Sequence, residues 1–330
     1  MRYRTLGREG PKVSSVCLGT WALSGFWGSS TEPAVEAVRR AFDLGVNFFD
    51  SAHSYGEGKA EAGLARGLGD LLRTHRSELV IATKGGLELH GNGVVRNSDA
   101  AFLRANLTDS LRTLGTDYVD VFLVHWPDPR IPQAETAGVL ADLVAEGLTR
   151  QVGVSNHTVE EMTEFSAVTP PQVAQVPFNM LDRSVEKRVL PHCEATGTGV
   201  MGWSALAHGV LAGALRPGQV FPPDDWRAYS PIFRGERFAE LLAAVDRLRG
   251  FAAERGHSVA QLALASVLAH PAQVVPVIGA QLPEHLEDSV RAVDIHLDES
   301  DLLALEGLLA GAPELDGSGD QPPARAERAA

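Results

Sequence analysis

Residues 47–58 read Asn47-Phe48-Phe49-Asp50-Ser51-Ala52-His53-Ser54-Tyr55-Gly56-Glu57-Gly58. The apolar run from Val46 to Asp50 is typical of a strand buried on both faces that ends on a carboxylate. Gly56 and Gly58 permit the backbone to bend after Tyr55, and a helical pattern begins at Glu57. An acid at a barrel-strand end and a phenol on the next loop are placed for chemistry. Taken alone, the stretch fits a capped turn with an ordinary surface tyrosine equally well.

The same order of strand and helix repeats along the chain. Apolar runs predict eight strands at residues 16–20, 46–50, 79–84, 118–125, 151–155, 173–176, 199–203 and 274–278. Helical patterns lie at residues 33–44, 57–68, 98–114, 133–146, 159–165, 185–195, 236–254, 258–270, 283–292 and 299–309. Buried strands that alternate with helices predict an α/β fold, a parallel (β/α)8 or TIM barrel with extra helices. A hairpin around Gly10-Pro11 precedes the barrel.

The chain is expected to form one domain, because no break in composition divides residues 1–310. Residues 311–330 include Gly317-Ser318-Gly319-Asp320-Gln321-Pro322-Pro323 and are predicted to be a disordered tail. A doubly wound sheet is the alternative architecture. It is disfavoured because no Gly-x-Gly-x-x-Gly turn follows the first strand.

Composition limits the possible partners and compartments. The 330 residues are 44% hydrophobic and 22% charged and carry a formal charge of −13, which argues against nucleic acid but not against a small anion. The two cysteines, Cys17 and Cys193, make neither a disulfide framework nor a zinc site, so a cytoplasmic protein without a metal is expected. Neither a signal peptide nor a membrane-spanning run is apparent. The oligomeric state stays open.

Four polar residues follow neighbouring predicted strands, and they suggest a proton donor. Asp50 and Tyr55 follow the second strand, Lys84 ends the third and His125 ends the fourth. A phenol has a pKa near 10, and a neighbouring ammonium lowers it by stabilising the phenolate. A carboxylate can hold that ammonium, and a neutral imidazole can orient the substrate oxygen. Each residue alone has a structural explanation, as a helix cap, a salt-bridged lysine or a satisfied buried histidine, but their conjunction favours catalysis.

Several stretches resemble the aldo-keto reductase family, and the likeness extends from Tyr3 to about Leu309. The matching stretches are residues 48–56, Ala82-Thr83-Lys84, residues 120–126, Gly153-Val154-Ser155-Asn156 and Val277-Ile278-Gly279-Ala280. The loop from Asp224 onward is similar to the bacterial branch of general aldehyde and ketone reductases. The resemblance implies reversible, NAD(P)H-dependent reduction of an aldehyde or ketone, with the hydride coming from nicotinamide C4.

The resemblance also implies a role for each matching residue. Tyr55 would be the general acid, Lys84 and Asp50 would tune it, and His125 would orient the carbonyl. Ser155, Asn156 and Gln175 would hold the carboxamide, and Trp203 would stack on the nicotinamide ring. The other implied cofactor contacts are Gly19, Thr20, Trp21, Asp50, Ser204, Leu206, Gly209, Leu211, Gly213, Arg227, Ile278, Gly279, Ala280, Gln281, His285, Asp288 and Ser289. The expected walls of the substrate pocket are Trp21, Trp27, His53, Tyr55 and Trp126.

One position departs from the family pattern and bears on the cofactor. Relatives of this branch commonly have Lys or Arg after the Gly279-Ala280 pair to bind the 2′-phosphate of NADP, whereas this chain has Gln281. A charge-assisted hydrogen bond is about twice as strong as a neutral one. His285 or Arg291 could compensate. The expected cofactor is NADP(H), with NAD(H) possible because discrimination is weakened.

Two other functions remain open from the sequence. One is a regulatory or sensor subunit that binds cofactor on the same barrel with slow turnover. The other is a lyase that uses Lys84 for a Schiff base. The second is disfavoured because nearby Asp50 keeps the lysine charged and a poor nucleophile.

Overall fold

The computed structural model describes residues 1–25, 31–90, 93–223 and 225–315. Eight parallel strands close into a barrel in the order β10-β11-β12-β3-β4-β5-β8-β9, which confirms the predicted (β/α)8 fold. These strands are β3 (Cys17–Gly19), β4 (Phe48–Asp50), β5 (Val80–Gly85), β8 (Val119–Val124), β9 (Thr149–Ser155), β10 (Val173–Pro177), β11 (Gly199–Trp203) and β12 (Val275–Gly279).

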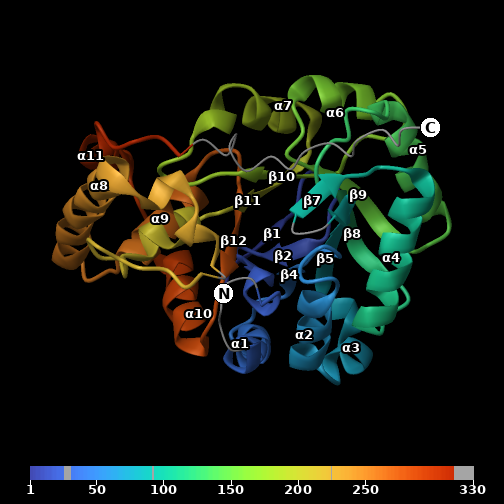
Figure 1. Cartoon of the computed structure of the whole chain (residues 1–330), viewed down its shortest axis with the longest axis horizontal. Coiled ribbons are helices and arrows are strands. Elements are labelled where there is room, and N and C mark those ends of the chain that lie inside the picture. Colours follow the sequence, from blue (N-terminus) through green and yellow to red (C-terminus); the bar gives the residue numbers. More distant parts are fainter. Residues whose placement is uncertain (26–30, 91–92, 224, 316–330) are drawn as a thin grey trace.

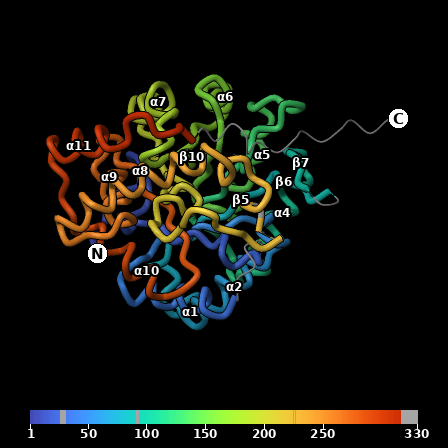
Figure 2. The backbone as a smooth tube through the Cα atoms, turned by 60° about the vertical axis from the view of Figure 1, so that its left-hand side comes forward, coloured from blue at the N-terminus to red at the C-terminus, as the bar shows by residue number. Residues whose placement is uncertain are grey.

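Helices surround the barrel (Figure 1). They are α1 (Thr31–Asp43), α2 (Lys59–Leu68), α3 (Leu71–Thr74), α4 (Ala100–Leu114), α5 (Gln133–Ala145), α6 (Val159–Phe165), α7 (Val189–Thr196), α8 (Gly235–Glu254), α9 (Val259–Ala269), α10 (Pro283–Val290) and α11 (Glu299–Leu309). The three helices α8, α9 and α11 gather on one side of the molecule, as both Figure 1 and Figure 2 show.

The core has two layers, because successive strand residues point to opposite faces. Phe48 lies inside the barrel with Val80 and Ala82, whereas its neighbour Phe49 packs outward under the helices. Both phenylalanine side chains are fully buried, and such burial stabilises the fold by roughly 2–3 kcal/mol each. The same alternation directs Asp50 and Lys84 inward and Thr83 outward, which positions the site described below.

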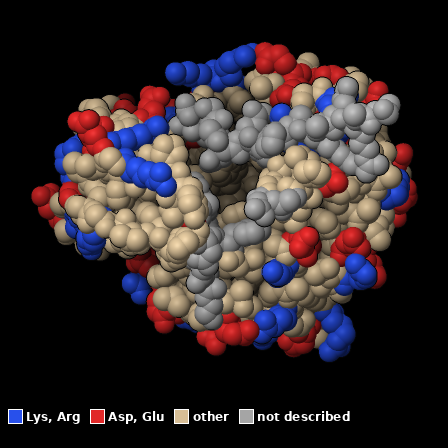
Figure 3. All heavy atoms as spheres, in the orientation of Figure 1, with Lys and Arg blue, Asp and Glu red and all other residues tan. Residues whose placement is uncertain are grey.

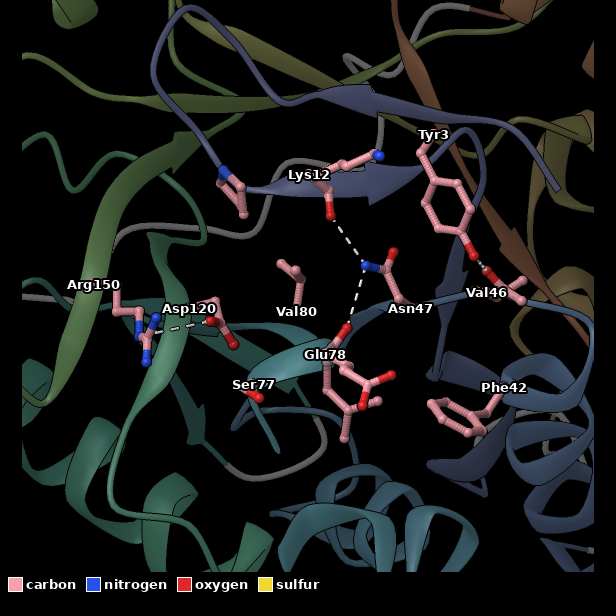
Figure 4. Close-up of a pocket in the computed structure, with 13 residues that line it drawn as sticks. Tyr3, Lys12, Phe42, Val46, Asn47, Ser77, Glu78, Val80, Asp120 and Arg150 are labelled. Atoms are coloured by element: carbon pink, nitrogen blue, oxygen red, sulfur yellow. Dashed lines mark hydrogen bonds and ion pairs between the residues drawn. The ribbon is translucent and has the colours of Figure 1, made fainter. Parts of the chain in front are cut away.

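The predicted hairpin, β1 (Tyr3–Thr5) with β2 (Lys12–Ser14), closes the N-terminal end of the barrel. A hollow of about 570 Å³ lies beside it (Figure 4). The Asn47 amide there donates to the Lys12 and Glu78 carbonyls, and Asp120 accepts from Arg76 at 2.8 Å. The hollow contains none of the four residues predicted to be catalytic.

The first residues of the predicted tail are ordered against the barrel domain. Leu315 is buried in the cluster that α8, α9 and α11 form, and its N–H donates to the Leu181 carbonyl at 2.8 Å. An apolar side chain at this position, rather than the average composition of the segment, decides the packing. Residues 316–330 lie outside the described residues, so their disorder stays a prediction.

A hairpin and a short α-helix were not predicted from the sequence. A hairpin of β6 (Leu87–His90) and β7 (Gly93–Arg96) follows β5, and the short helix α3 follows α2. Gly91-Asn92-Gly93, between two short alternating runs, was a usable turn signal for the hairpin.

Within the described ranges, no helix combines the length and apolar character needed to cross a bilayer. The face seen in Figure 3 is hollowed near its centre, and its charged side chains lie mainly toward the edge.

Candidate active site

The four predicted catalytic side chains meet at the C-terminal end of the barrel. Asp50 is the last residue of β4, Lys84 lies near the end of β5, and His125 follows β8 directly. Tyr55 comes from the loop after β4, where its N–H donates to the Ala52 carbonyl. Because neighbouring parallel strands end at one edge, Lys84 contacts Asp50, 34 positions before it, and His125 contacts Ser54, 71 positions before it.

Lys84 is the centre of this group. Its ammonium donates to Asp50 Oδ2 at 2.7 Å, to the Ser51 carbonyl at 2.8 Å and to the Tyr55 hydroxyl at 3.3 Å. The side chain is fully buried, so each of its three N–H groups requires such an acceptor. The other carboxylate oxygen of Asp50 accepts from the Gln175 amide at 2.9 Å. The predicted carboxylate therefore holds the predicted ammonium against the phenol.

Burial and neighbouring charges together set the pKa values of Lys84 and Tyr55. Burial alone would lower the pKa of Lys84, but the charges and hydrogen bonds of Asp50 and Tyr55 outweigh it and the pKa is raised. For Tyr55, burial outweighs the attraction of Lys84, so the phenol pKa is raised rather than lowered. The expected lowering by the ammonium is present but smaller than the effect of burial. The pair consists of a charged lysine and a protonated phenol at neutral pH.

His125 lies edge-on to the Tyr55 ring, with centroids 5.6 Å apart. Burial and the charge of Lys84 hold the pKa of His125 well below its usual range. The imidazole is therefore neutral, and its Nδ1 lies 3.4 Å from the Ser54 hydroxyl. A neutral ring beside the phenol has one donor and one acceptor nitrogen, as the role of orienting a carbonyl oxygen requires.

The ends of β9, β10 and β11 bring together the residues assigned to the carboxamide. Asn156, in the left-handed conformation at φ +62°, accepts from the Trp203 indole at 3.0 Å and donates to the Ser155 hydroxyl at 3.0 Å. Its amide also donates to the His125 carbonyl. Asn156 thus fixes the Trp203 ring and joins it to the catalytic strands, a role that the sequence did not indicate.

The loop after β11 turns sharply beside Trp203. Ser204, Ala207, His208 and Gly209 all have positive φ angles, and the buried Ser204 hydroxyl has no hydrogen-bond partner among the described residues. Leu211 is buried in the core, so only its backbone can face a ligand. Arg227 does not project freely, because it binds the buried Asp225 carboxylate through two nitrogens.

The residues predicted to surround the adenosine end lie at and after β12. Gln281 is half-buried and lies just before α10, and His285 is exposed in the first turn of this helix. The Asp288 carboxylate accepts from the Ser258 hydroxyl at 2.7 Å and from the Gln261 amide at 2.6 Å, so it binds the two side chains that form the capping box of α9. Ser289 is buried beside it. Neither neighbour of Gln281 in the chain is a lysine or arginine that could replace the basic residue found at this position in relatives.

The predicted pocket walls lie partly beside the catalytic group. Trp21 contacts the Tyr55 ring edge-on, with centroids 4.8 Å apart, and the Thr20 hydroxyl donates to Ser51. The His53 N–H donates to the Lys84 carbonyl, which places His53 at the same strand ends. Trp126 is half-buried after β8. Trp27 lies outside the described residues.

Sequence reasoning missed one residue close to the catalytic group. Glu61 is fully buried in the first turn of α2 and accepts a hydrogen bond from the Thr83 hydroxyl at 2.6 Å. In the sequence it looked like one more polar residue of an amphipathic helix. Within the described part of the chain, no group of three or more potential metal ligands gathers.

The comparison with known families agrees with this geometry. The model of the aldo/keto reductase family matches residues 15–310, nearly the whole barrel. The chain belongs to the aldo/keto reductase family. It is thus an oxidoreductase of a family whose members act on carbonyl groups with NADH or NADPH, and the resemblance noted in the motifs is confirmed.

Individual members of the aldo/keto reductase family match over most of their length. The chain is 35% identical to the aldo-keto reductase YhdN of Bacillus subtilis over 290 residues, 87% of each chain. It is 28% identical to the NADH-specific methylglyoxal reductase of Escherichia coli, over 91% of this chain and 96% of that one. The structure of a glycerol dehydrogenase from Gluconobacter oxydans superposes with a TM-score of 0.85 at 33% identity, covering 96% of this chain and 98% of that one.

Proposed function

We propose that this protein reduces aldehydes or ketones reversibly with NAD(P)H, with Tyr55 as the proton donor. The observation that carries the proposal is the buried Lys84 ammonium, which binds Asp50 at 2.7 Å and the Tyr55 hydroxyl at 3.3 Å at the end of the barrel. As a carbonyl oxygen gains negative charge, Tyr55 gives it a proton, and the neighbouring ammonium stabilises the phenolate that remains. Neutral His125 holds the carbonyl oxygen in place.

The residues of the mouth fit a nicotinamide dinucleotide. The buried Ser204 hydroxyl has no hydrogen-bond partner within the described chain, and a Cβ at Gly279 would meet no atom within 4 Å. Trp203 would stack on the nicotinamide, and Ser155 would donate its hydroxyl to the carboxamide oxygen. Gln175, whose amide nitrogen binds Asp50, would accept from the carboxamide nitrogen. When bound, the nicotinamide supplies a hydride from C4.

The proposed cofactor preference is a weak one for NADP(H) over NAD(H). The first turn of α10 favours an anion, and Gln281 adds neutral hydrogen bonds in place of a charged one. An NADH-specific relative at 28% identity supports activity with both cofactors. The absence of a charged residue at Gln281 predicts only a few-fold discrimination. Aromatic walls at Trp21 and Trp126 suit carbonyl substrates of moderate size. The proposed location of the protein is the cytoplasm.

A panel of carbonyl compounds, followed at the absorbance band of NADPH and of NADH, tests the proposal. We expect steady oxidation of the cofactor with at least one aldehyde and the reverse reaction with the corresponding alcohol. Tight cofactor binding without turnover across the panel would instead indicate the sensor subunit. Labelling of Lys84 by a carbonyl compound and borohydride would indicate the lyase.

A further inference from the structure

The carboxyl group of Glu61 lies in an unusually costly position. The side chain is fully buried, and Oε1 accepts from the Thr83 hydroxyl at 2.6 Å. Its other oxygen, Oε2, and the buried Ser110 hydroxyl make no hydrogen bond of good geometry within the described residues. Burial raises the pKa of Glu61 against the opposing effects of the Thr83 bond, of the adjacent Ser110 hydroxyl and of the Lys84 charge. A buried apolar side chain at this point of the helix would avoid the free-energy cost of burying a carboxyl group.

The hydrogen bond from Thr83 to Glu61 joins the two elements that carry the proton donor and its ammonium. Glu61 lies in α2, whose neighbouring Ala60 N–H donates to the Tyr55 carbonyl at 3.1 Å. Thr83 precedes Lys84 in β5, so Thr83 faces the helices while Lys84 faces the barrel interior. The bond therefore holds the Tyr55 loop and the Lys84 strand together from behind the site.

The loop between Tyr55 and α2 needs such an anchor. Gly56, Glu57 and Gly58 have φ angles of +66°, +56° and +85°, and Glu57 has no glycine-like freedom in this region. A non-glycine residue held there costs on the order of 1 kcal/mol and persists only where its surroundings fix it. A Cβ at Gly56 would lie 2.5 Å from the Ser24 carbonyl oxygen, so the loop also follows a close backbone approach.

We propose that Glu61 is a positioning residue for the Tyr55–Lys84 pair. Through Thr83 it sets the separation between the phenol and the ammonium, and it makes no contact with substrate or cofactor. The inference rests on the proposed function, because its consequence is the proton-donating strength of Tyr55. Loss of the bond would let the Tyr55 loop and the end of β5 move apart, and the phenol would lose part of the influence of Lys84.

Substitutions at residue 61 test the proposal in the full-length protein. Glu61→Leu should lower kcat by roughly tenfold or more with KM for aldehyde and cofactor within about twofold, because a small misplacement of catalytic groups slows the chemical step. The basic limb of the pH profile of kcat should move to higher pH. Glu61→Gln keeps an oxygen acceptor for Thr83 and should restore most of the rate. The matched control is Glu57→Gln, which removes an exposed charge from the same loop and should behave as wild type.

A second pair of variants decides the matter if Glu61→Leu does not fold. Thr83→Val removes the hydroxyl at nearly constant volume and should reproduce the loss of kcat and the shifted pH profile, whereas Thr83→Ser should retain wild-type behaviour. A lowered melting temperature with unchanged kcat and an unchanged pH profile would show a purely structural role and overturn the proposal.

A measurement that needs no turnover separates this inference from the proposed function. The chain has four tyrosines, so the phenolate absorbance of a protein minus that of its Tyr55→Phe counterpart reports Tyr55 alone. We expect the Tyr55 phenolate to form at higher pH in Thr83→Val than in wild type. Identical titrations would refute the positioning role even in an active enzyme, and a shifted titration in a protein that reduces no carbonyl would refute the proposed function alone.

Discussion

Replacing Tyr55 by Phe removes a single oxygen from the centre of the site. The ring keeps its volume and its edge contacts with Trp21 and His125, at centroid distances of 4.8 Å and 5.6 Å. Lys84 loses its longest hydrogen bond but keeps Asp50 at 2.7 Å and the Ser51 carbonyl at 2.8 Å. Removing the hydroxyl leaves one N–H of the buried ammonium without an acceptor, so the free energy of unfolding should fall by about 1–3 kcal/mol.

The effect on catalysis should be larger than the effect on stability. A positioned general acid contributes a factor of about 10² to 10⁴ in rate, which corresponds to roughly 3–5 kcal/mol of transition-state stabilisation. Neither KM nor the dissociation constant of the cofactor should change by more than a few-fold, because in the proposed mechanism the hydroxyl would donate to the reacting oxygen rather than bind the dinucleotide. Carbonyl reduction should therefore fall by about 10² to 10⁴ in kcat.

The assay is the steady-state oxidation of NADPH with an aldehyde, together with cofactor titration by protein fluorescence. Tyr3→Phe is a matched control, because its hydroxyl also makes one hydrogen bond, to the Gly45 carbonyl at 2.8 Å, but at the opposite end of the barrel. A Tyr55→Phe protein that binds cofactor and turns over near the wild-type rate would refute the assignment of the proton donor.

Four further predictions follow from the geometry. Lys84→Met should cut reduction at pH 7 by a factor on the order of 10² and move the basic limb of the pH–rate profile upward, because the phenolate loses its counter-charge; an unchanged rate and profile would contradict the role. Gln281→Arg should raise the ratio of kcat/KM for NADPH over NADH by about tenfold, the scale of one added charged hydrogen bond, and a wild-type ratio already above about a thousand would show that another group binds the phosphate. Truncation after Leu315 should leave the melting temperature unchanged, whereas truncation after Ala312 should lower it by a few degrees through the loss of the buried Leu315 side chain, about 2 kcal/mol. Burial lowers the pKa of His157 to about 4, so as the pH falls from 6.5 toward 4 its protonation in the unfolded chain should remove up to about 3 kcal/mol of stability. Urea unfolding of wild type and His157→Gln at pH 7 and pH 4.5 measures this. An equal loss of unfolding free energy between the two pH values in both proteins would contradict it.

The strand ends could be read from the sequence because each barrel strand is a short apolar run followed by a polar residue. Asp50, Lys84 and His125 were found by that rule, and the alternation along β5 was enough to direct Lys84 inward. Their contacts could be inferred only by assuming the barrel. The direction in which the pKa of Tyr55 shifts could not be read from the sequence, because it depends on how far the fold buries the phenol.

Partners that lie across the fold were also beyond the sequence. The assignment of Asn156 to the cofactor stays a prediction; the structure adds that Asn156 accepts from the Trp203 indole, a pairing that depends on its left-handed backbone. Glu61 was indistinguishable from a solvent-facing helix residue until α2 was placed against β5. Leu315 followed a segment whose average composition indicated disorder. Individual side chains, rather than average patterns, decided these three cases.

The hairpin of β1 and β2 has a practical consequence. Tyr3 is tied to Gly45, and Met1 packs on the core near the start of β4, so the chain begins at the end of the barrel opposite the reacting groups. A linker attached at Met1 would leave the molecule on the face opposite the strand ends that carry Asp50, Lys84 and His125. Immobilisation through the N-terminus should therefore present the open end of every barrel to the bulk solution.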